Sequence, residues 1–338
     1  MTGKERVRKA IQFKEPDRVP CWFLTADSDM TTDVGRTASR TFNPLCEQEL
    51  RTRVPGFDGE LTHNEWGNIR GQLQTDLSTS ETVRSAFQDW SEFDDWRLPD
   101  IDAGYRYEEA GRKLEGRGGK YGLAWFGSFY FGTLYNIKKM DELLLDLGLH
   151  QERLQEFCAR LEPVFFRCLE RWKEAGADGV LFGNDLGLQD RLFMNPDTWR
   201  EIFLPFHRNF YRKAHELGLD VLMHSCGYIR DIIPDLIDAG LDVLQFDQIR
   251  IYDLDDLSRL CSGRICFFCP VDIQSVMPSG DKETIEREVA TMIEKLGTTG
   301  GGFLGKDYPQ WQAVGVKEEW AQWARDAFRR YGRYDSTR

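Results

Sequence analysis

The 338-residue sequence lacks any run of 18 apolar residues, so it contains no candidate transmembrane helix. It also lacks an excess of basic residues, since 44 Lys and Arg against 56 Asp and Glu give a net charge of −12. Nucleic acids and anionic membranes attract basic surfaces, and neither is expected as the main partner. Residues 1–6 show no signal-peptide hydrophobic segment, and a cytoplasmic location is expected.

Cysteine is too sparse for a disulfide framework. Eight cysteines in a chain of this length are more typical of a protein in a reducing compartment, where thiols stay free for metal binding or core packing. Cys158 and Cys168 lie on the apolar stripe of a helix predicted over residues 150–175, so we expect both to be packing residues.

Strand-like apolar runs alternate with amphipathic helical segments along most of the chain. Strict alternation of this kind indicates a parallel sheet. The pattern predicts an α/β fold, a (β/α)8 TIM barrel forming a single domain over residues 1–338, with a doubly wound open sheet as the alternative. Residues 25–118 lack clean periodicity and are predicted to form an insertion that covers one end of the barrel. The eight strand candidates lie near residues 19, 57, 120, 179, 219, 241, 264 and 302.

One helix carries clear start and interruption signals. Asn195 followed by Pro196 predicts an N-cap with proline at the first helical position. The helix is expected to run to about Leu217, and Pro205 within it predicts a kink.

The segment Val221–Gly227 reads VLMHSCG and holds the most specific pattern in the chain. Side chains two apart on a strand share one face, so His224 and Cys226 should project together at its C-terminal end. An imidazole beside a thiol suits a soft divalent metal, zinc first. The alternative is a buried His and Cys that are satisfied by their neighbours.

Other polar residues also follow strands, and in a barrel the active site lies at the C-terminal ends of the strands. Burying charge is costly, so a convergence of such residues favours a functional site over a purely structural barrel. Any one acid could instead be a helix N-cap. In chain order these residues are Asp185, His224, Cys226, Asp247, Cys269 with Asp272, and Lys306 with Asp307.

A catalytic zinc site needs a third protein ligand. Cys269 ends a strand two places round the barrel from His224 and Cys226, and alternate strands contribute to the same inward layer. Cys269 is therefore the predicted third ligand, while Cys266 falls on the opposite pleat face and is expected in the core. Substitutes for Cys269 are Asp185, Asp247 and Asp307.

Three stretches of the chain resemble the uroporphyrinogen decarboxylase superfamily. They read KERVRKAIQFKEPDRVPCWF, FGNDLGLQDRLFMNPDTWREIFLPF and HSCGYIRDIIPDLIDAGLDVLQFDQ, and they occur in the family's order. The resemblance spans nearly the whole chain, with residues 25–118 matched least. True uroporphyrinogen decarboxylases carry Arg-Gln-Ala-Gly-Arg after the first strand to bind porphyrinogen carboxylates. This chain has LTADSDM at residues 24–30, so tetrapyrrole decarboxylation is not expected.

The chain is more similar to the cobamide-dependent methyltransferase branch, which binds zinc through His-x-Cys and a distant cysteine. His224 and Cys226 match the first two ligands, whereas the last strand, where the cysteine usually lies, has Gly305–Asp307. The resemblance implies a zinc-dependent methyltransferase that moves methyl between a small substrate, such as a thiol or methyl ether, and a corrinoid. The corrinoid would sit on a separate binding protein, because no DxHxxG-type segment is present. A homodimer is the oligomeric state that the family implies.

The remaining site roles follow from this interpretation. Asp185 and Asp247 are expected to act as general acid or base. The aromatic run at residues 125–131 is expected to line a pocket for an apolar or aromatic methyl donor, with ordinary barrel-to-helix packing as the alternative. The residues expected to contact the substrate are Trp22, Phe126, Tyr130 and Lys306.

Two other functions stay open at this stage. One is a decarboxylase or lyase of the uroporphyrinogen decarboxylase type, acting on a non-porphyrin carboxylated substrate with or without metal. The other is a barrel that has lost its site and serves as a partner protein. Metal analysis together with turnover assays would separate the three.

Overall fold

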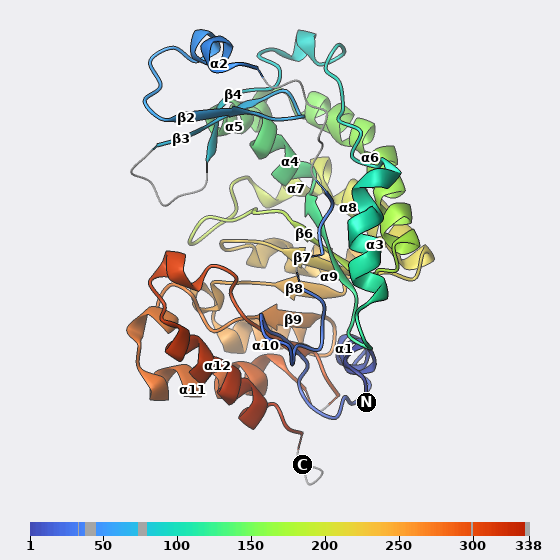
Figure 1. Ribbon diagram of the computed structural model, residues 1–338, viewed down its shortest axis with the longest axis vertical. Helices are drawn as coiled ribbons and strands as arrows, with labels where there is room; N and C mark the ends of the chain where they lie inside the picture. Colours follow the sequence, from blue (N-terminus) through green and yellow to red (C-terminus); the bar gives the residue numbers. More distant parts are fainter. Residues whose placement is uncertain (33, 38–44, 74–79, 299, 335–338) are drawn as a thin grey trace.

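The computed structural model describes residues 1–32, 34–37, 45–73, 80–298 and 300–334. Its main feature is a curled parallel sheet of seven strands in the order β1-β10-β9-β8-β7-β6-β5 (Figure 1). The predicted α/β barrel class is confirmed, with seven hydrogen-bonded strands in place of eight. The strands are β1 (Cys21–Trp22), β5 (Leu123–Ser128), β6 (Gly179–Gly183), β7 (Asp220–His224), β8 (Val243–Gln245), β9 (Cys266–Cys269) and β10 (Phe303–Lys306).

The prediction of a barrel strand near residue 57 is wrong. The chain there enters a separate antiparallel sheet of β2 (Glu60–His63), β3 (Ile69–Gln72) and β4 (Glu81–Arg84). Residues of β2 and β3 alternate between buried and more exposed, which is typical of an antiparallel sheet with one face toward solvent. A barrel strand must be covered on both faces, and this segment is too polar for that position.

Extended chain without regular strand structure lies between β1 and β5 instead. Isolated parallel bridges join Met30 to Tyr121 and Gly35 to Trp125. The Asp29 amide donates to the carbonyl of Cys21, which connects the same segment to β1. The sheet is therefore completed by backbone that follows β1 directly.

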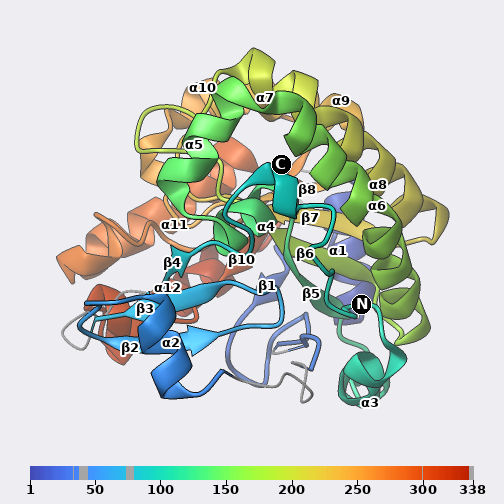
Figure 2. The ribbon, with the colours of Figure 1, turned by 90° about the horizontal axis from the view of Figure 1, so that it is seen from above.

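Helices cover the outer face of the sheet, and Figure 2 shows α6, α8 and α9 along one side of it. None of the helices in the described ranges is both long and apolar enough to cross a bilayer. The helices are α1 (Gly3–Ile11), α2 (Glu47–Arg53), α3 (Glu108–Glu115), α4 (Tyr130–Ile137), α5 (Met140–Leu149), α6 (Gln151–Glu174), α7 (Pro196–Ile202), α8 (Leu204–Glu216), α9 (Ile233–Ala239), α10 (Leu254–Cys261), α11 (Lys282–Leu296) and α12 (Glu318–Tyr331).

The start and interruption signals of the predicted helix at 195–217 are confirmed. The Asn195 side chain accepts a hydrogen bond from the Asp197 amide and caps α7. Pro205 lies in the first turn of α8, so the predicted kink is a break at Phe203 between two helices. The predicted stripe of α6 is also buried throughout, including Cys158 and Cys168.

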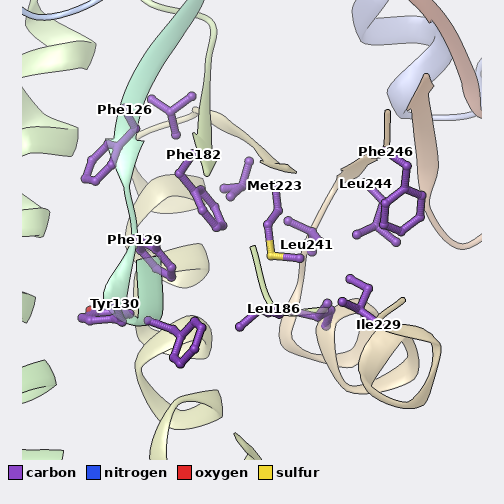
Figure 3. Packing of buried hydrophobic residues seen from close by; sticks show 14 of the residues in the cluster. Phe126, Phe129, Tyr130, Phe182, Leu186, Met223, Ile229, Leu241, Leu244 and Phe246 are labelled. Atoms are coloured by element: carbon purple, nitrogen blue, oxygen red, sulfur yellow. The ribbon is translucent and has the colours of Figure 1, made fainter. Parts of the chain in front are cut away.

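The two faces of the curled sheet belong to different packing layers. Leu222, Val243 and Cys266 pair in register and belong to the interior cluster, to which α1 also contributes apolar side chains. The alternate residues, such as Met223 and Leu244, belong to the larger cluster between sheet and helices, part of which is seen in Figure 3. A strand residue's layer therefore follows from its parity alone.

Candidate metal centre

Three potential metal-ligating side chains meet where β6 and β7 end. Asp185, His224 and Cys226 each place one ligand atom within 4.8 Å of the other two. His224 Nε2 lies 3.2 Å from Asp185 Oδ1 and 3.4 Å from Cys226 Sγ. Across the residues that the structure describes, this is the one such group of three or more.

Two glycines bring the loops after β6 and β7 into backbone contact. Gly227 has φ +76°, a conformation that favours glycine, and a Cβ there would lie 2.0 Å from the Gly187 carbonyl oxygen. A Cβ on Gly187 would lie 2.4 Å from the Tyr228 nitrogen. Across this contact the Cys226 amide donates to Asp185 Oδ1 at 2.8 Å. The distance between the Asp185 and Cys226 side chains is therefore set by the backbone.

A chain of hydrogen bonds orients the histidine. His224 Nδ1 lies 2.5 Å from Gln245 Oε1, and Gln245 Nε2 donates to Asp247 Oδ1 at 2.8 Å. An ionised carboxylate only accepts, so the Gln245 NH2 must face Asp247 and its oxygen must face the imidazole. Nδ1 of His224 is then the donor, and Nε2 is the nitrogen directed at Asp185 and Cys226.

A buried ion pair closes this chain. Lys306 Nζ donates to the same Oδ1 of Asp247 at 2.6 Å, and its ammonium also lies 6.0 Å from the Trp22 ring centroid and 5.7 Å from that of Tyr308. Burial alone would raise the pKa of Asp247, but the charges of Lys306 and His224 hold it below its usual value. Asp247 is therefore a carboxylate at neutral pH.

The charges within the group shift its own acid–base behaviour. Burial raises the pKa of Asp185, yet hydrogen bonds from His224 and Cys226 outweigh it and leave that pKa below the usual value. Burial lowers the pKa of His224, and the hydrogen bonds to Asp185 and Cys226 together with the charge of Asp247 raise it well above 6.5. The groups around His224 thus stabilise positive charge on its imidazole.

The donor set fits a zinc ion. One nitrogen, one sulfur and one carboxylate oxygen are all established zinc ligands. Donors on one tetrahedral zinc lie about 3.3–3.6 Å apart, given bond lengths of about 2.0–2.3 Å. The separations of 3.2 Å and 3.4 Å at His224 Nε2 are close to these values.

Cys269, the predicted third ligand, is not part of this group, and the inward direction predicted for it is wrong. On β9, Cys266 and Phe268 belong to the barrel interior, while Phe267 and Cys269 belong to the layer under the helices. Burial raises the pKa of Cys269 to about 12, which keeps it a neutral thiol. The two cysteines do occupy opposite faces and Cys266 is in the core, as expected. Asp185, one of the predicted substitutes, lies where the third donor is needed.

The other residues predicted at the site separate into two groups. Asp247, Lys306 and Trp22 lie at the C-terminal ends of their strands, which form the mouth of the barrel, and the contacts just described join them. Phe126 and Tyr130 are fully buried in the outer layer, where Phe126 packs on Phe165 of α6 and Phe210 of α8. Figure 3 shows both beside Phe129 and Phe182, so they expose no surface to a ligand and take the packing role considered as the alternative.

Gln245 escaped the sequence-based prediction, whereas Trp125 belongs to the aromatic run at residues 125–131 that was expected to line a pocket. Gln245 was detectable as an amide inside an apolar strand, two residues before Asp247. Trp125 is 45% exposed, and a Cβ on Gly183 would lie 3.1 Å from its indole. Because Gly183 pairs with His224, this places the Trp125 ring over the strand next to the metal-ligating group.

Comparisons with known proteins agree with this architecture. A family model for uroporphyrinogen decarboxylase (URO-D) matches residues 133–304, just over half of the chain. The methylated-thiol–coenzyme M methyltransferase of Methanosarcina mazei is 26% identical over 106 residues, which cover 31% of this chain and 27% of that protein. The match thus spans only about a quarter of that relative's length. A solved methyltransferase structure from Methanosarcina mazei has the same fold, with TM-score 0.66 and 14% identity over 98% of this chain and 99% of that one.

Proposed function

The chain belongs to the uroporphyrinogen decarboxylase family, and from this premise we propose that it is a methyltransferase. It would move a methyl group between a small substrate, such as a thiol or methyl ether, and a corrinoid held by a separate protein. The observation that carries the proposal is the Asp185–His224–Cys226 group at the C-terminal ends of the strands. The similarity to the methylated-thiol–coenzyme M methyltransferase of Methanosarcina mazei supports it, and a solved methyltransferase of that organism has the same fold.

Asp185, His224 and Cys226 would hold one zinc ion. When bound, zinc supplies a Lewis acid that lowers the pKa of a substrate thiol or polarises an ether oxygen. The Asp185 carboxylate and the Cys226 thiolate would supply the negative charge and His224 a neutral nitrogen. The Gln245 oxygen, which accepts from His224 Nδ1, would keep Nε2 directed toward the other two ligands. Asp185 would therefore be a ligand in place of the general acid or base expected from sequence.

Asp247 is better suited to positioning than to proton transfer. A carboxylate whose pKa lies below its usual value is a poor general acid or base near neutral pH. Lys306 donates to the Asp247 carboxylate and holds it in place. The carboxylate accepts from the Gln245 NH2 group, which leaves the Gln245 oxygen facing His224. Asp247 thus stabilises the imidazole orientation through Gln245.

The metal-ligating group is open to solvent on the side of Asp185. The Asp185 side chain is 36% exposed, and the Trp125 indole covers the neighbouring strand. An aromatic surface of this kind would exclude water from one side of the substrate. The corrinoid protein would dock over the same open side, since methyl transfer requires the two reacting atoms to approach directly.

The proposal is tested by metal analysis and a methyl-transfer screen on the purified protein. We expect about one zinc per chain, and demethylation of methylcobalamin by thiols or methylation of Co(I) corrinoid by methylated substrates. Cys226→Ser should bind zinc more weakly and lose methyl transfer, while Cys46→Ser, a change at an exposed cysteine, should keep both. Zinc-free protein without methyl transfer would overturn the proposal, and zinc-free decarboxylation of a carboxylate would favour the lyase alternative.

A further inference from the structure

A polar cavity lies between the end of β5, the helix α4 and the antiparallel β2–β4 sheet. Its volume is about 250 Å³. Its apolar walls include Trp66 and Phe165. Its polar lining includes Arg36, Arg70, Ser128, Thr133 and Asn136.

Among the described residues, the cavity lining has two cations and no compensating acid. Its lining contains no Asp or Glu. Arg36 donates to the Ile101 carbonyl at 3.2 Å and contacts the Cys168 thiol, whereas Arg70 donates to Ser80 and to Asn136 Oδ1. Neither guanidinium forms an ion pair with a carboxylate of the described residues, although the chain carries a net charge of −12. Half-buried cations without a counter-charge favour the entry of an anion.

A buried hydroxyl in the same cavity also lacks a partner. The Thr133 residue is 2% exposed, and its Oγ1 makes no hydrogen bond to any residue that the structure describes. Buried hydroxyls are nearly always satisfied, so an orphan in a cavity lining marks a place for an acceptor. An oxyanion would accept from this hydroxyl and from the two guanidinium groups together.

The cavity and the metal-ligating group are neighbours. Ser128 pairs with Gly183, which pairs with His224, so their backbones are roughly 10 Å apart across three adjacent strands. The charges of Asp185 and of Arg70 both act on the Tyr135 phenol. Burial raises its pKa to about 12, with Asp185 raising it further and Arg70 opposing that shift.

We propose that this cavity binds the acidic group of a small molecule whose other end reaches Asp185, His224 and Cys226. The acidic group is a carboxylate, sulfonate or phosphate, and Arg36, Arg70 and Thr133 recognise it. This rests on the proposed function and specifies it, because the methyl donor or acceptor is then an anion. Binding of the acid itself requires neither metal nor methyl transfer.

The test is calorimetric titration of the full chain with 6-mercaptohexanoate and with its neutral analogue 6-mercaptohexanol. The acid should bind at least about tenfold more tightly, because hydrogen bonds to charged groups are strong. Arg36→Gln and Arg70→Gln should abolish the preference, and Arg36→Lys should keep most of it. Arg112→Gln makes the same charge change at an exposed position on α3 and should have no effect. Equal binding of acid and alcohol by the native chain would overturn the proposal.

Two further measurements keep the result clear. Arg70 also donates hydrogen bonds to Ser80 and Asn136, so Arg70→Gln changes the local structure as well as the charge. Titration of the native chain at increasing KCl concentration tests the charge alone. Salt should weaken binding of the acid and leave that of the alcohol unchanged, and equal salt dependence would contradict the site. Hexanoate, 1-hexanesulfonate and hexyl phosphate distinguish the three acids. If they bind through Arg36 while no thiol is methylated, the cavity stands and the methyltransferase proposal fails.

Discussion

The inward and outward faces of β6, β7 and β8 carry opposite chemistry at the same height. Phe182, Met223 and Leu244 pair in register under the helices, and one residue further Gly183, His224 and Gln245 pair on the inward side. The first row is apolar and close-packed, whereas His224 and Gln245 of the second row belong to a hydrogen-bonded chain ending in an ion pair. A step of one residue therefore separates a packing position from a chemical one.

Two buried histidines show the same contrast. His207 lies in the outer layer against Phe129 and Trp199, and burial lowers its pKa to about 3. His224 is on the inner face, where nearby acids overcome burial and raise its pKa well above the usual value. Burial alone does not determine the charge of a histidine, because the neighbouring charges decide it.

The largest expected effect is on stability, from a change on the outer face. Phe182→Ala removes a fully buried ring that packs against Phe129, Phe210 and Tyr211. It should lower the free energy of unfolding by about 3–5 kcal/mol, as measured by urea denaturation. Zinc content of the folded variant should not change, and Leu145→Ala, at an exposed position, should cost under about 0.5 kcal/mol. Loss of zinc from folded Phe182→Ala protein would contradict the separation of the faces.

Next is a pair of cysteine changes, one on each side. Cys226→Ser should weaken zinc binding by on the order of a hundred- to a thousandfold, because about 10–16 kcal/mol of zinc affinity is shared among three or four ligands. Cys269→Ser should keep zinc, since this thiol belongs to the outer layer. Competition with a chromogenic chelator measures both. Equal losses in the two variants would return Cys269 to the site.

A smaller effect is expected behind the histidine. Gln245→Leu leaves His224 Nδ1 and Asp247 without their shared partner. Zinc affinity should fall by about 10- to 100-fold, the usual cost of losing such a support. The same chelator competition applies, with Gln274→Leu at an exposed position as the matched control. Unchanged affinity would show that Gln245 does not orient the ligand.

The smallest effect concerns the pH dependence of stability. The folded pKa of His207 is about 3 and its unfolded value is 6.5, so below pH 6.5 the unfolded chain binds a proton that the folded chain does not. This contribution is complete above pH 6.5 and falls by about 1.4 kcal/mol per pH unit below it. Urea denaturation at pH 7.0 and 5.5 should show His207→Gln losing about 1.4 kcal/mol less than the native chain. An identical loss in both would refute the assignment.

Sequence reasoning reached the fold and the core of the site because both depend on local periodicity. The alternation of strands and helices, the buried stripe of α6 and the His224–Cys226 pair are all patterns within a few residues. Cys269 failed because its face depends on where β9 begins, and an error of one residue reverses every side chain. Asp185 was present among the substitutes, but its contact with the Cys226 amide depends on two loops meeting in space.

The contact between Gly187 and Gly227 has a consequence for how this site can change. The donors are held apart by main chain that admits no side chain at either glycine. Exchanging Asp185 for another ligating residue alters which metal is preferred while the distance between the loops persists. Enlarging either glycine moves both loops and removes the site whatever ligands it carries. The two glycines therefore constrain the site more strictly than the identity of its metal-ligating side chains does.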